Sequence, residues 1–414
     1  MLESDQGFLS VGERGSLLAE LRRRLAEIEI APVRAVTPAP APWAPAWAVA
    51  PKTPRRRIAL ADLPGARIRD GIGVVTTRYD ASHTAGGVAP ADALVTPPAV
   101  LAALAQVRAD PDLARGIRFL DCETTGLAGG AGTLAFIIGV AWFEDDGSLV
   151  VEQLILSSPA DEPELLDLLS ERLAGGTMLV TFNGRTFDGP LLRTRHVLAR
   201  RPPGPLATLP HLDLLPIARR LWRARSENCR QLTLERTILG QRRVDDMPGS
   251  MAPAAYAAWL QTGDASALED IVRHNRDDVV GMAALLAAAL RVLEAPETWA
   301  EDAREEVAVG EEWLRRGQPA RAATVLTRVL AKTTRPELGG SSGSARRGAD
   351  GPLMDRALRQ LARAQRQSGD VEAARMTWRT VRAERAAASV SMTDAHQPHI
   401  TNAPTVTLSG CASR

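Results

Sequence analysis

The chain has 414 residues, of which 45% are hydrophobic and 24% are charged, and its formal net charge is +1. Such a balance is ordinary for a globular protein, and no overall field draws the chain toward nucleic acid or a membrane. The three cysteines are widely separated and form no CxxC pair, which excludes the spacing of a zinc site or disulfide framework. No apolar run is long enough to cross a bilayer, and the N-terminus lacks a signal-peptide core, so we expect a cytoplasmic protein.

The first hundred residues divide into two parts by composition. Residues 1–56 contain a short amphipathic segment, 15–30, followed by an Ala/Pro-rich linker with too many prolines for a helix or a sheet. Residues 57–100 combine glycines with short β-prone pieces and predict a small β appendage.

From residue 101 to 294 the pattern is that of one α/β domain. Strands are predicted at "GIRFLDCE", "TLAFIIGVAWFED", "GSLVVEQLILS" and "TMLVTFNG". Helices are predicted at "EPELLDLLSERLAGG", which begins acidic and ends at glycine, and at "GPLLRTRHVLARR". Three adjacent strands followed by alternating helix and strand indicate a mixed sheet flanked by helices.

The C-terminal part is predicted to be helical. Residues 295–385 contain two similar units, each a helix, a polar glycine-containing turn ("RRGQP", "QSGDV") and a second helix. These units resemble tetratricopeptide hairpins, so we expect a small all-α tetratricopeptide-like region. Residues 386–414 are polar and predict a disordered tail.

Acidic side chains stand at several strand and helix ends of the α/β domain. Asp121 and Glu123 are two residues apart on a predicted strand and therefore project from the same face, near its C-terminal end. Ligands gather at such ends in open α/β sheets. Asp188 begins the helix after a later strand, where a role as a helix cap explains it about equally well.

A fourth acid lies on a predicted helix near residue 280. Its apolar stripe, set by spacings of three and four, contains two polar residues, His274 and Asp278. A polar pair on a core-facing stripe is informative, although a buried structural His–Asp contact also accounts for it.

One hypothesis replaces these separate structural explanations: the four carboxylates converge on divalent metal. Without a cation, clustered acids repel and raise each other's pKa. Hard oxygen ligands with few histidines favour Mg²⁺ or Mn²⁺ over zinc. Two such ions can clamp a phosphodiester for in-line attack by water.

The quoted segments also resemble a known family. "DCETTGL", "TFNGRTFDGPLL" and "HNRDDVV" are similar to the three exonuclease motifs of the DEDD superfamily, which has a ribonuclease-H-like fold. With "HLDLLPIARRLW" and "LTLERTILG", the pattern resembles YprB-type ribonuclease-H-like proteins over roughly residues 115–293. The resemblance implies that the metal ligands are Asp121, Glu123, Asp188 and Asp278.

The same resemblance implies a metal-dependent nuclease, specifically a 3′→5′ exonuclease that hydrolyses single-stranded nucleic acid with two Mg²⁺ or Mn²⁺ ions. Superfamily members place a tyrosine four residues, or a histidine five residues, before the last aspartate. Here His274 stands four residues before Asp278, and we expect it to aid the attacking water. Four residues are expected beside the terminal nucleotide, namely Thr124, Thr125, Gly126 and Asn183.

Other features of the domain leave alternatives open. Asp213 is interpreted as a supporting or structural acid. Residues 193–243 contain twelve arginines against three acids, which fits a nucleic-acid path or a solvated helix surface. Trp222 and Tyr256 are more typical of helix packing than of base stacking.

Two rival functions fit parts of the pattern. The segments "FLDCETTG", "LVTF" and "RDD" imitate haloacid-dehalogenase-like phosphatases, but that chemistry needs a lysine, and none occurs between Lys52 and Lys332. The second rival is a non-catalytic module that binds nucleic acid or a protein partner, the latter through the C-terminal helices.

Overall fold

The computed structural model describes residues 58–126, 132–244, 246–334 and 343–394. The predictions for the amphipathic segment over 15–30 and for the Ala/Pro-rich linker lie outside these residues, as does most of the glycine-rich loop that follows Gly126.

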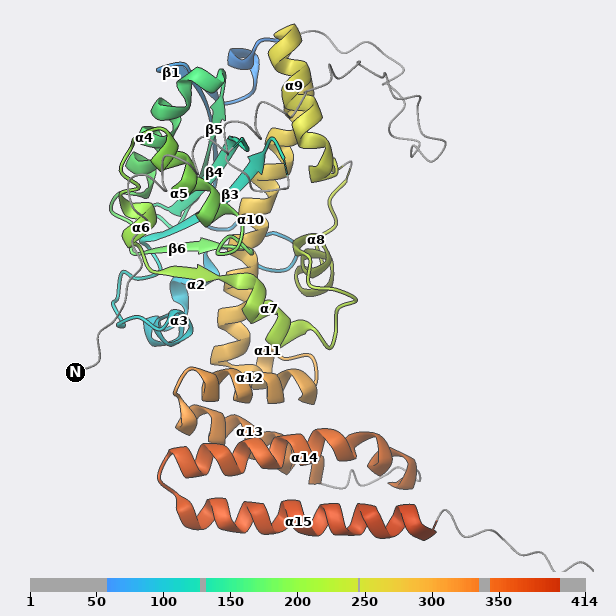
Figure 1. Cartoon of the computed structure of the whole chain (residues 1–414). Helices are drawn as coiled ribbons and strands as arrows, with labels where there is room; N and C mark the ends of the chain where they lie inside the picture. The colour runs from blue at the N-terminus through green and yellow to red at the C-terminus, as the bar shows by residue number, and fades with distance from the viewer. Residues whose placement is uncertain (1–57, 127–131, 245, 335–342, 395–414) are drawn as a thin grey trace, which may run out of the picture. The chain divides into compact units, whose positions relative to one another are not determined.

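A seven-stranded mixed sheet forms the centre of the α/β part (Figure 1). In space the strands follow the order β1-β2-β5-β4-β3-β6-β7. The pairs β1–β2, β2–β5, β5–β4 and β4–β3 are antiparallel, whereas β3–β6 and β6–β7 are parallel. The strands are β1 (Ala66–Arg69), β2 (Ile72–Tyr79), β3 (Ile117–Thr124), β4 (Ala135–Phe143), β5 (Leu149–Leu156), β6 (Met178–Thr181) and β7 (His211–Asp213).

The central strands explain why the sheet needs a cover on both faces. Nearly every residue of β4 and β5 is buried and most are apolar, as expected for strands between two helical layers. The two strands meet at a tight turn in which Gly147 has a φ of +84°, a conformation that favours glycine. The prediction of a mixed sheet flanked by helices is confirmed.

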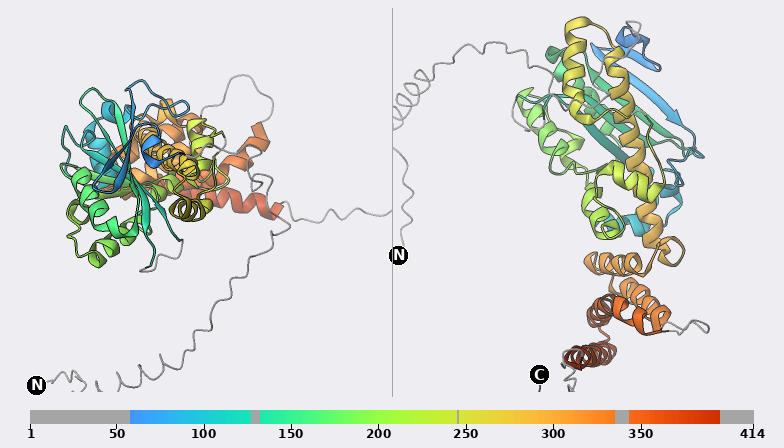
Figure 2. Two further views of the ribbon diagram at one scale, coloured as in Figure 1. Left: turned by 90° about the horizontal axis from the view of Figure 1, so that it is seen from above. Right: turned by 90° about the vertical axis from the view of Figure 1, so that its right-hand side faces the viewer.

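Neighbouring residues of β5 identify the two helical layers. Glu152 forms an ion pair with Arg172 of α4 (Glu162–Leu173) on one face. Gln153 points to the other face, where its amide donates to the Val272 carbonyl of α10 (Ser266–Glu294) at 2.7 Å. The views in Figure 2 show α10 and α4 on opposite sides of the sheet.

Shorter helices complete the α/β part. They are α2 (Asp92–Val95), α3 (Pro98–Ala105), α5 (Asp188–Leu198), α6 (Pro205–Thr208), α7 (Leu214–Trp222), α8 (Gln231–Leu234) and α9 (Ala252–Thr262). Helix α8 continues into a π-helical turn, Glu235–Leu239. Short 3₁₀ turns occur at Leu60–Asp62, Pro159–Asp161 and Gly249–Met251. Among the described helices, none has the length and apolar character needed to span a membrane.

The hairpin β1–β2 is not a separate appendage, in contrast to the expectation for residues 57–100. All eight residues of β2 pair with β5, so the hairpin extends the main sheet. The β-prone pieces were recognised, but their partner strand lies at least seventy residues further along the chain, and strand composition does not specify a distant partner.

The C-terminal part consists of α11 (Pro296–Trp299) and two helical hairpins, α12 (Ala303–Arg315) with α13 (Pro319–Thr334) and α14 (Gly343–Gln367) with α15 (Val371–Asp394). Gly317 and Gly369 lie in the two turns that the sequence predicted, and both adopt positive φ. Their tetratricopeptide character stays a prediction. The sequence predicted a disordered tail from residue 386, but α15 continues to Asp394, so this boundary was placed too early. Residues 395–414 lie outside the described part.

Candidate metal centre

Asp121 and Glu123 lie near the end of β3 and face α10. In the sheet, Asp121 pairs with Gly139 of β4, which in turn pairs with Gln153 of β5. Asn275 of α10 lies across all three strands: its amide donates to Asp121 Oδ2 at 2.9 Å and its oxygen accepts from Gln153 at 3.0 Å. A Cβ on Gly139 would lie 2.4 Å from Asn275 Oδ1, so the glycine permits this close approach of helix and sheet.

Asp188 reaches the same place from the start of α5. The N-cap position is occupied by Phe187, so Asp188 is not the helix cap that the alternative required. Its carboxylate lies close enough to Cys122 of β3 that the thiol and backbone of that residue lower the pKa of Asp188 against the effect of burial. Asp188 therefore lies beside β3.

Asp213 supports the loop that leads to Asp188. The buried carboxylate accepts from the backbone N–H groups of Asn183 at 2.8 Å and Arg185 at 3.2 Å. It also caps α7 by accepting from Leu215 N–H at 3.0 Å. The loop needs such support because Asn183 has a φ of +69°, in the left-handed region.

Asp278 and His274 approach from α10, as the apolar stripe predicted. Ligand atoms of Glu123, His274 and Asp278 all lie within 4.8 Å of one another. His274 Nε2 is 3.5 Å from Asp278 Oδ2. Residues of β3 and α10 that are separated by more than 150 positions in the chain therefore meet at one place. The charge of Asp188, on α5, is close enough to raise the pKa values of Asp121 and Glu123.

The cluster carries negative charge that the protein itself does not fully balance. Burial raises the pKa of Asp121 well above its ordinary value, and the charges of Asp278, Asp188 and Glu123 add to this effect. Burial likewise raises the pKa of Glu123 to about 7, despite the opposing effect of His274, and that of Asp188 to about 6. Within the described residues, Asp278 alone of the four acids pairs with an arginine.

These residues fit a hard divalent cation. The donors are carboxylate oxygens, which Mg²⁺ and Mn²⁺ prefer, and the raised pKa values show that a cation would relieve their repulsion. The described residues around the cluster offer a single imidazole, that of His274, and the one thiol in contact with it, Cys122, has a pKa raised by burial. A soft or nitrogen-preferring ion is therefore less well matched.

Several further residues at the site were not identified from the sequence. Arg243, with a side chain 5% exposed, donates to Asp278 Oδ1 and to Glu235 Oε1, at 2.6 Å in each case. Asp246 Oδ1 lies 2.7 Å from His274 Nδ1. A Cβ on Gly281 of α10 would lie 2.1 Å from Glu235 Oε1, so this glycine makes room for the π-helical turn. The segment around residue 243 has no hydrophobic periodicity that predicts a helix or a strand. Only its acids and arginines indicated weakly that it could belong to a charged site.

The environment of His274 favours its charged form. Burial opposes the charge, but the carboxylate of Asp278 and the hydrogen bond with Asp246 more than offset this effect, so the pKa of His274 is raised. Nδ1 of His274 carries a proton that it donates to Asp246. The other ring nitrogen, Nε2, faces Asp278.

The residues expected to contact substrate are close in sequence to Glu123 or Asp188. Thr124 donates its hydroxyl to the Gly126 carbonyl at 3.1 Å. The Thr125 hydroxyl accepts from Leu134 N–H at 2.9 Å and thus closes the β3–β4 connection. Asn183 lies in the loop before Asp188, and its backbone is anchored by Asp213. The expected contacts with a nucleotide stay predictions.

The two aromatic residues considered for base stacking are packed inside the protein. Trp222 is 2% exposed and donates to Glu305 at 2.8 Å. Tyr256 is 3% exposed, stacks on Phe136 and donates to the Leu156 carbonyl. Helix packing, the preferred interpretation, is confirmed for both.

Comparison with known proteins defines the class of the domain. Residues 118–290 match the model of the RNase_H superfamily. The mixed sheet with its flanking helices is accordingly a ribonuclease-H-like domain.

One curated protein is similar to part of this chain. Over 168 residues the chain is 39% identical to "Uncharacterized protein YprB" of Bacillus subtilis (strain 168), a match that covers 40% of each protein. The chain therefore spans about 40% of the length of this curated relative. The resemblance to YprB-type proteins is confirmed to this extent, and the DEDD subtype stays a prediction.

Proposed function

We propose that this protein is a metal-dependent nuclease, a 3′→5′ exonuclease that hydrolyses phosphodiester bonds of single-stranded nucleic acid. The observation that carries the proposal is that Glu123, His274 and Asp278 lie together on a ribonuclease-H-like domain. Asp121 and Asp188 are close enough for the charges of the acids to raise the pKa values of Asp121 and Glu123. The 3′→5′ direction of hydrolysis rests on the resemblance of the three motifs to those of DEDD exonucleases.

The four carboxylates would hold two Mg²⁺ or Mn²⁺ ions. When bound, such ions supply Lewis-acid stabilisation to the scissile phosphate and the leaving oxygen. Asn275 keeps Asp121 in place by donating a hydrogen bond to its carboxylate. Preorganised ligands of this kind avoid the cost of rearrangement during the reaction.

His274 is the group that we assign to proton transfer. In its neutral form, Nε2 can accept a proton from an attacking water, while Asp246 holds the Nδ1 proton and stabilises the resulting charge. Asp246 is thus a positioning residue that acts through His274.

The experiment measures release of nucleoside 5′-monophosphates from single-stranded DNA and RNA blocked at the 3′ or the 5′ end, with and without Mn²⁺. Asp121→Asn should abolish release, and Asp277→Asn is the matched control. Asp277 lies beside Asp278 but pairs with Arg276, so the same chemical change there should leave activity intact. Normal release by Asp121→Asn would contradict the proposal.

The pairing of Arg243 with Asp278 favours a second candidate, a non-catalytic module that binds nucleic acid or protein. The guanidinium balances part of the charge that a metal would otherwise balance. This candidate predicts binding of oligonucleotide without release of nucleotides at any Mg²⁺ or Mn²⁺ concentration, whereas the nuclease predicts both.

A further inference from the structure

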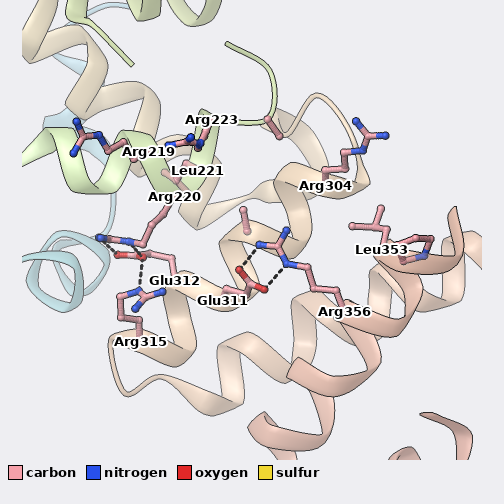
Figure 3. Close-up of a pocket in the computed structure, with 13 residues that line it drawn as sticks. Arg219, Arg220, Leu221, Arg223, Arg304, Glu311, Glu312, Arg315, Leu353 and Arg356 are labelled. Carbon is pink, nitrogen blue, oxygen red and sulfur yellow. Dashed lines mark hydrogen bonds and ion pairs between the residues drawn. The ribbon is translucent and has the colours of Figure 1, made fainter. Parts of the chain in front are cut away.

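A basic cleft lies between α7 of the α/β part and the helices α12 and α14 (Figure 3). Its volume is about 770 Å³, within the range of roughly 300–1,000 Å³ usual for ligand sites. Six arginines and two glutamates, Glu311 and Glu312, line it, together with small and apolar residues. We call it the arginine cleft, after Arg219, Arg220, Arg223, Arg304, Arg315 and Arg356.

Half of these arginines form ion pairs with the two glutamates. Glu312 is fully buried and pairs with Arg220 at 2.5 Å and with Arg315 at 3.5 Å. Glu311 pairs with Arg356 through two hydrogen bonds of 2.6 and 2.7 Å. The dashed interactions in Figure 3 all end on these two glutamates.

The other three arginines are exposed, and within the described part of the chain they form no ion pair. They are Arg219, Arg223 and Arg304. Arg219 and Arg223 are four residues apart at the end of α7, so they lie on the same side of the helix, where like charges repel. The cleft therefore presents uncompensated positive charge to the solvent.

The helix dipole does not explain the position of Arg304. A basic residue at the C-terminal end of α7 is stabilised by the helix dipole, which accounts for Arg219 and Arg223 in part. Arg304 is the second residue of α12, where the positive end of the dipole disfavours a cation. An arginine at this position, opposite two others, fits an anion bound between the helices.

Helix α7 connects the cleft to the candidate metal centre. It begins after Asp213, which anchors the loop before Asp188 and whose charge raises the pKa of Asp188. It ends at Trp222, beside Arg223 in the cleft. Nine residues of helix span about 14 Å, which equals roughly four nucleotides of a stacked strand.

We propose that the arginine cleft binds the sugar-phosphate backbone of a single-stranded nucleic acid, a few nucleotides from the end that lies at the metal centre. The inference rests on the proposed function, because it assumes that the strand enters that site. Arg219, Arg223 and Arg304 contact phosphates, whereas the arginines paired with Glu311 and Glu312 shape the cleft.

The test compares the triple variant Arg219→Gln/Arg223→Gln/Arg304→Gln with the wild-type protein. Binding of a fluorescein-labelled 20-nucleotide single-stranded DNA is followed by fluorescence anisotropy in EDTA, so no catalysis is needed. Loss of three phosphate contacts should reduce the slope of log affinity against log salt by about 2. The affinity ratio of wild type to variant should then fall about 20-fold between 50 and 200 mM salt.

A matched control carries the same change of charge elsewhere. Arg108, Arg379 and Arg382 are also exposed, form no ion pair among the described residues, and lie outside the cleft. Their triple replacement by glutamine should leave the salt slope unchanged. Hydrolysis of the p-nitrophenyl ester of thymidine 5′-monophosphate, which is too short to reach the cleft, should be equal in all three proteins if the nuclease proposal holds.

The outcomes separate the two proposals. An unchanged salt slope in the cleft variant, an equal reduction in the control variant, or displacement of the DNA by a polyglutamate peptide at equal charge would overturn the cleft proposal even if hydrolysis continues. A reduced slope in the cleft variant alone supports it. Absence of hydrolysis by the wild-type protein, with that reduced slope, would remove the nuclease proposal and leave the cleft as a nucleic-acid site.

Discussion

The clustered acids make the stability of the metal-free protein depend on pH in an unusual direction. A carboxyl group whose pKa is higher in the folded than in the unfolded chain takes up protons on folding. The free energy of unfolding then falls as pH rises from the unfolded to the folded pKa. For Glu123 this window runs from 4.5 to about 7, and for Asp188 from 3.8 to about 6. His274 acts with the same sign, because its raised pKa gives stability that is lost as pH rises through it.

The size of the effect follows from the pKa of Glu123, whose side chain is buried. A rise from 4.5 to about 7 corresponds to about 3 kcal/mol of lost stability between pH 4 and pH 8. The neighbouring acids titrate together with it, so their contributions do not add in full. For a domain of this size, about 3 kcal/mol corresponds to a fall of roughly 6–12 °C in Tm.

Thermal unfolding in EDTA from pH 4 to pH 8 measures this effect. Asp121→Asn/Glu123→Gln removes the acids with little change of shape and should flatten the dependence relative to the wild type. Mg²⁺ or Mn²⁺ should raise the Tm of the wild type at pH 8 but not at pH 4, where the acids are protonated. Asp277→Asn serves as control. The reasoning is refuted if the double variant and the wild type show the same dependence on pH.

Three further changes test the support of the site. Gly139→Ala places a Cβ 2.4 Å from Asn275 Oδ1 and should cost about 1–3 kcal/mol in urea unfolding, whereas wild-type stability would show that α10 can shift without cost. Asp213→Ala leaves three backbone N–H groups without their acceptor and should lower the free energy of unfolding by about 2 kcal/mol. It should also reduce nucleotide release, and both quantities are measured on one preparation. Asp246→Asn should lower the pKa of His274 and move the corresponding limb of the pH–rate profile to lower pH; an unmoved profile would separate His274 from proton transfer.

The sequence was most informative where local patterns carry the structure. Asp121 and Glu123 project from one face because they alternate on a strand, and His274 and Asp278 share a helix face because they are four residues apart. Both relations depend on backbone geometry alone, so they could be predicted without tertiary contacts. The meeting of these pairs was then inferred from chemistry, since clustered acids call for a cation.

The remaining contacts depend on tertiary structure that no short pattern encodes. Arg243 and Asp246 lie in an irregular segment, and they reach Asp278 and His274 only after the chain has folded back across the domain. The role of Asn275 likewise depends on strands that come together only in the sheet. The tail was predicted from polarity, which does not prevent α15 from extending to Asp394.

The two margins of the sheet restrict how other molecules attach. At one margin β1 has only four residues, among them Arg67 and Arg69, and at the other β7 has only three. A peptide or second copy that added itself as a further strand would gain few main-chain hydrogen bonds and, at β1, would encounter guanidinium groups. Association by strand addition is therefore weak at both sides, and partners of this protein are expected to dock against helices.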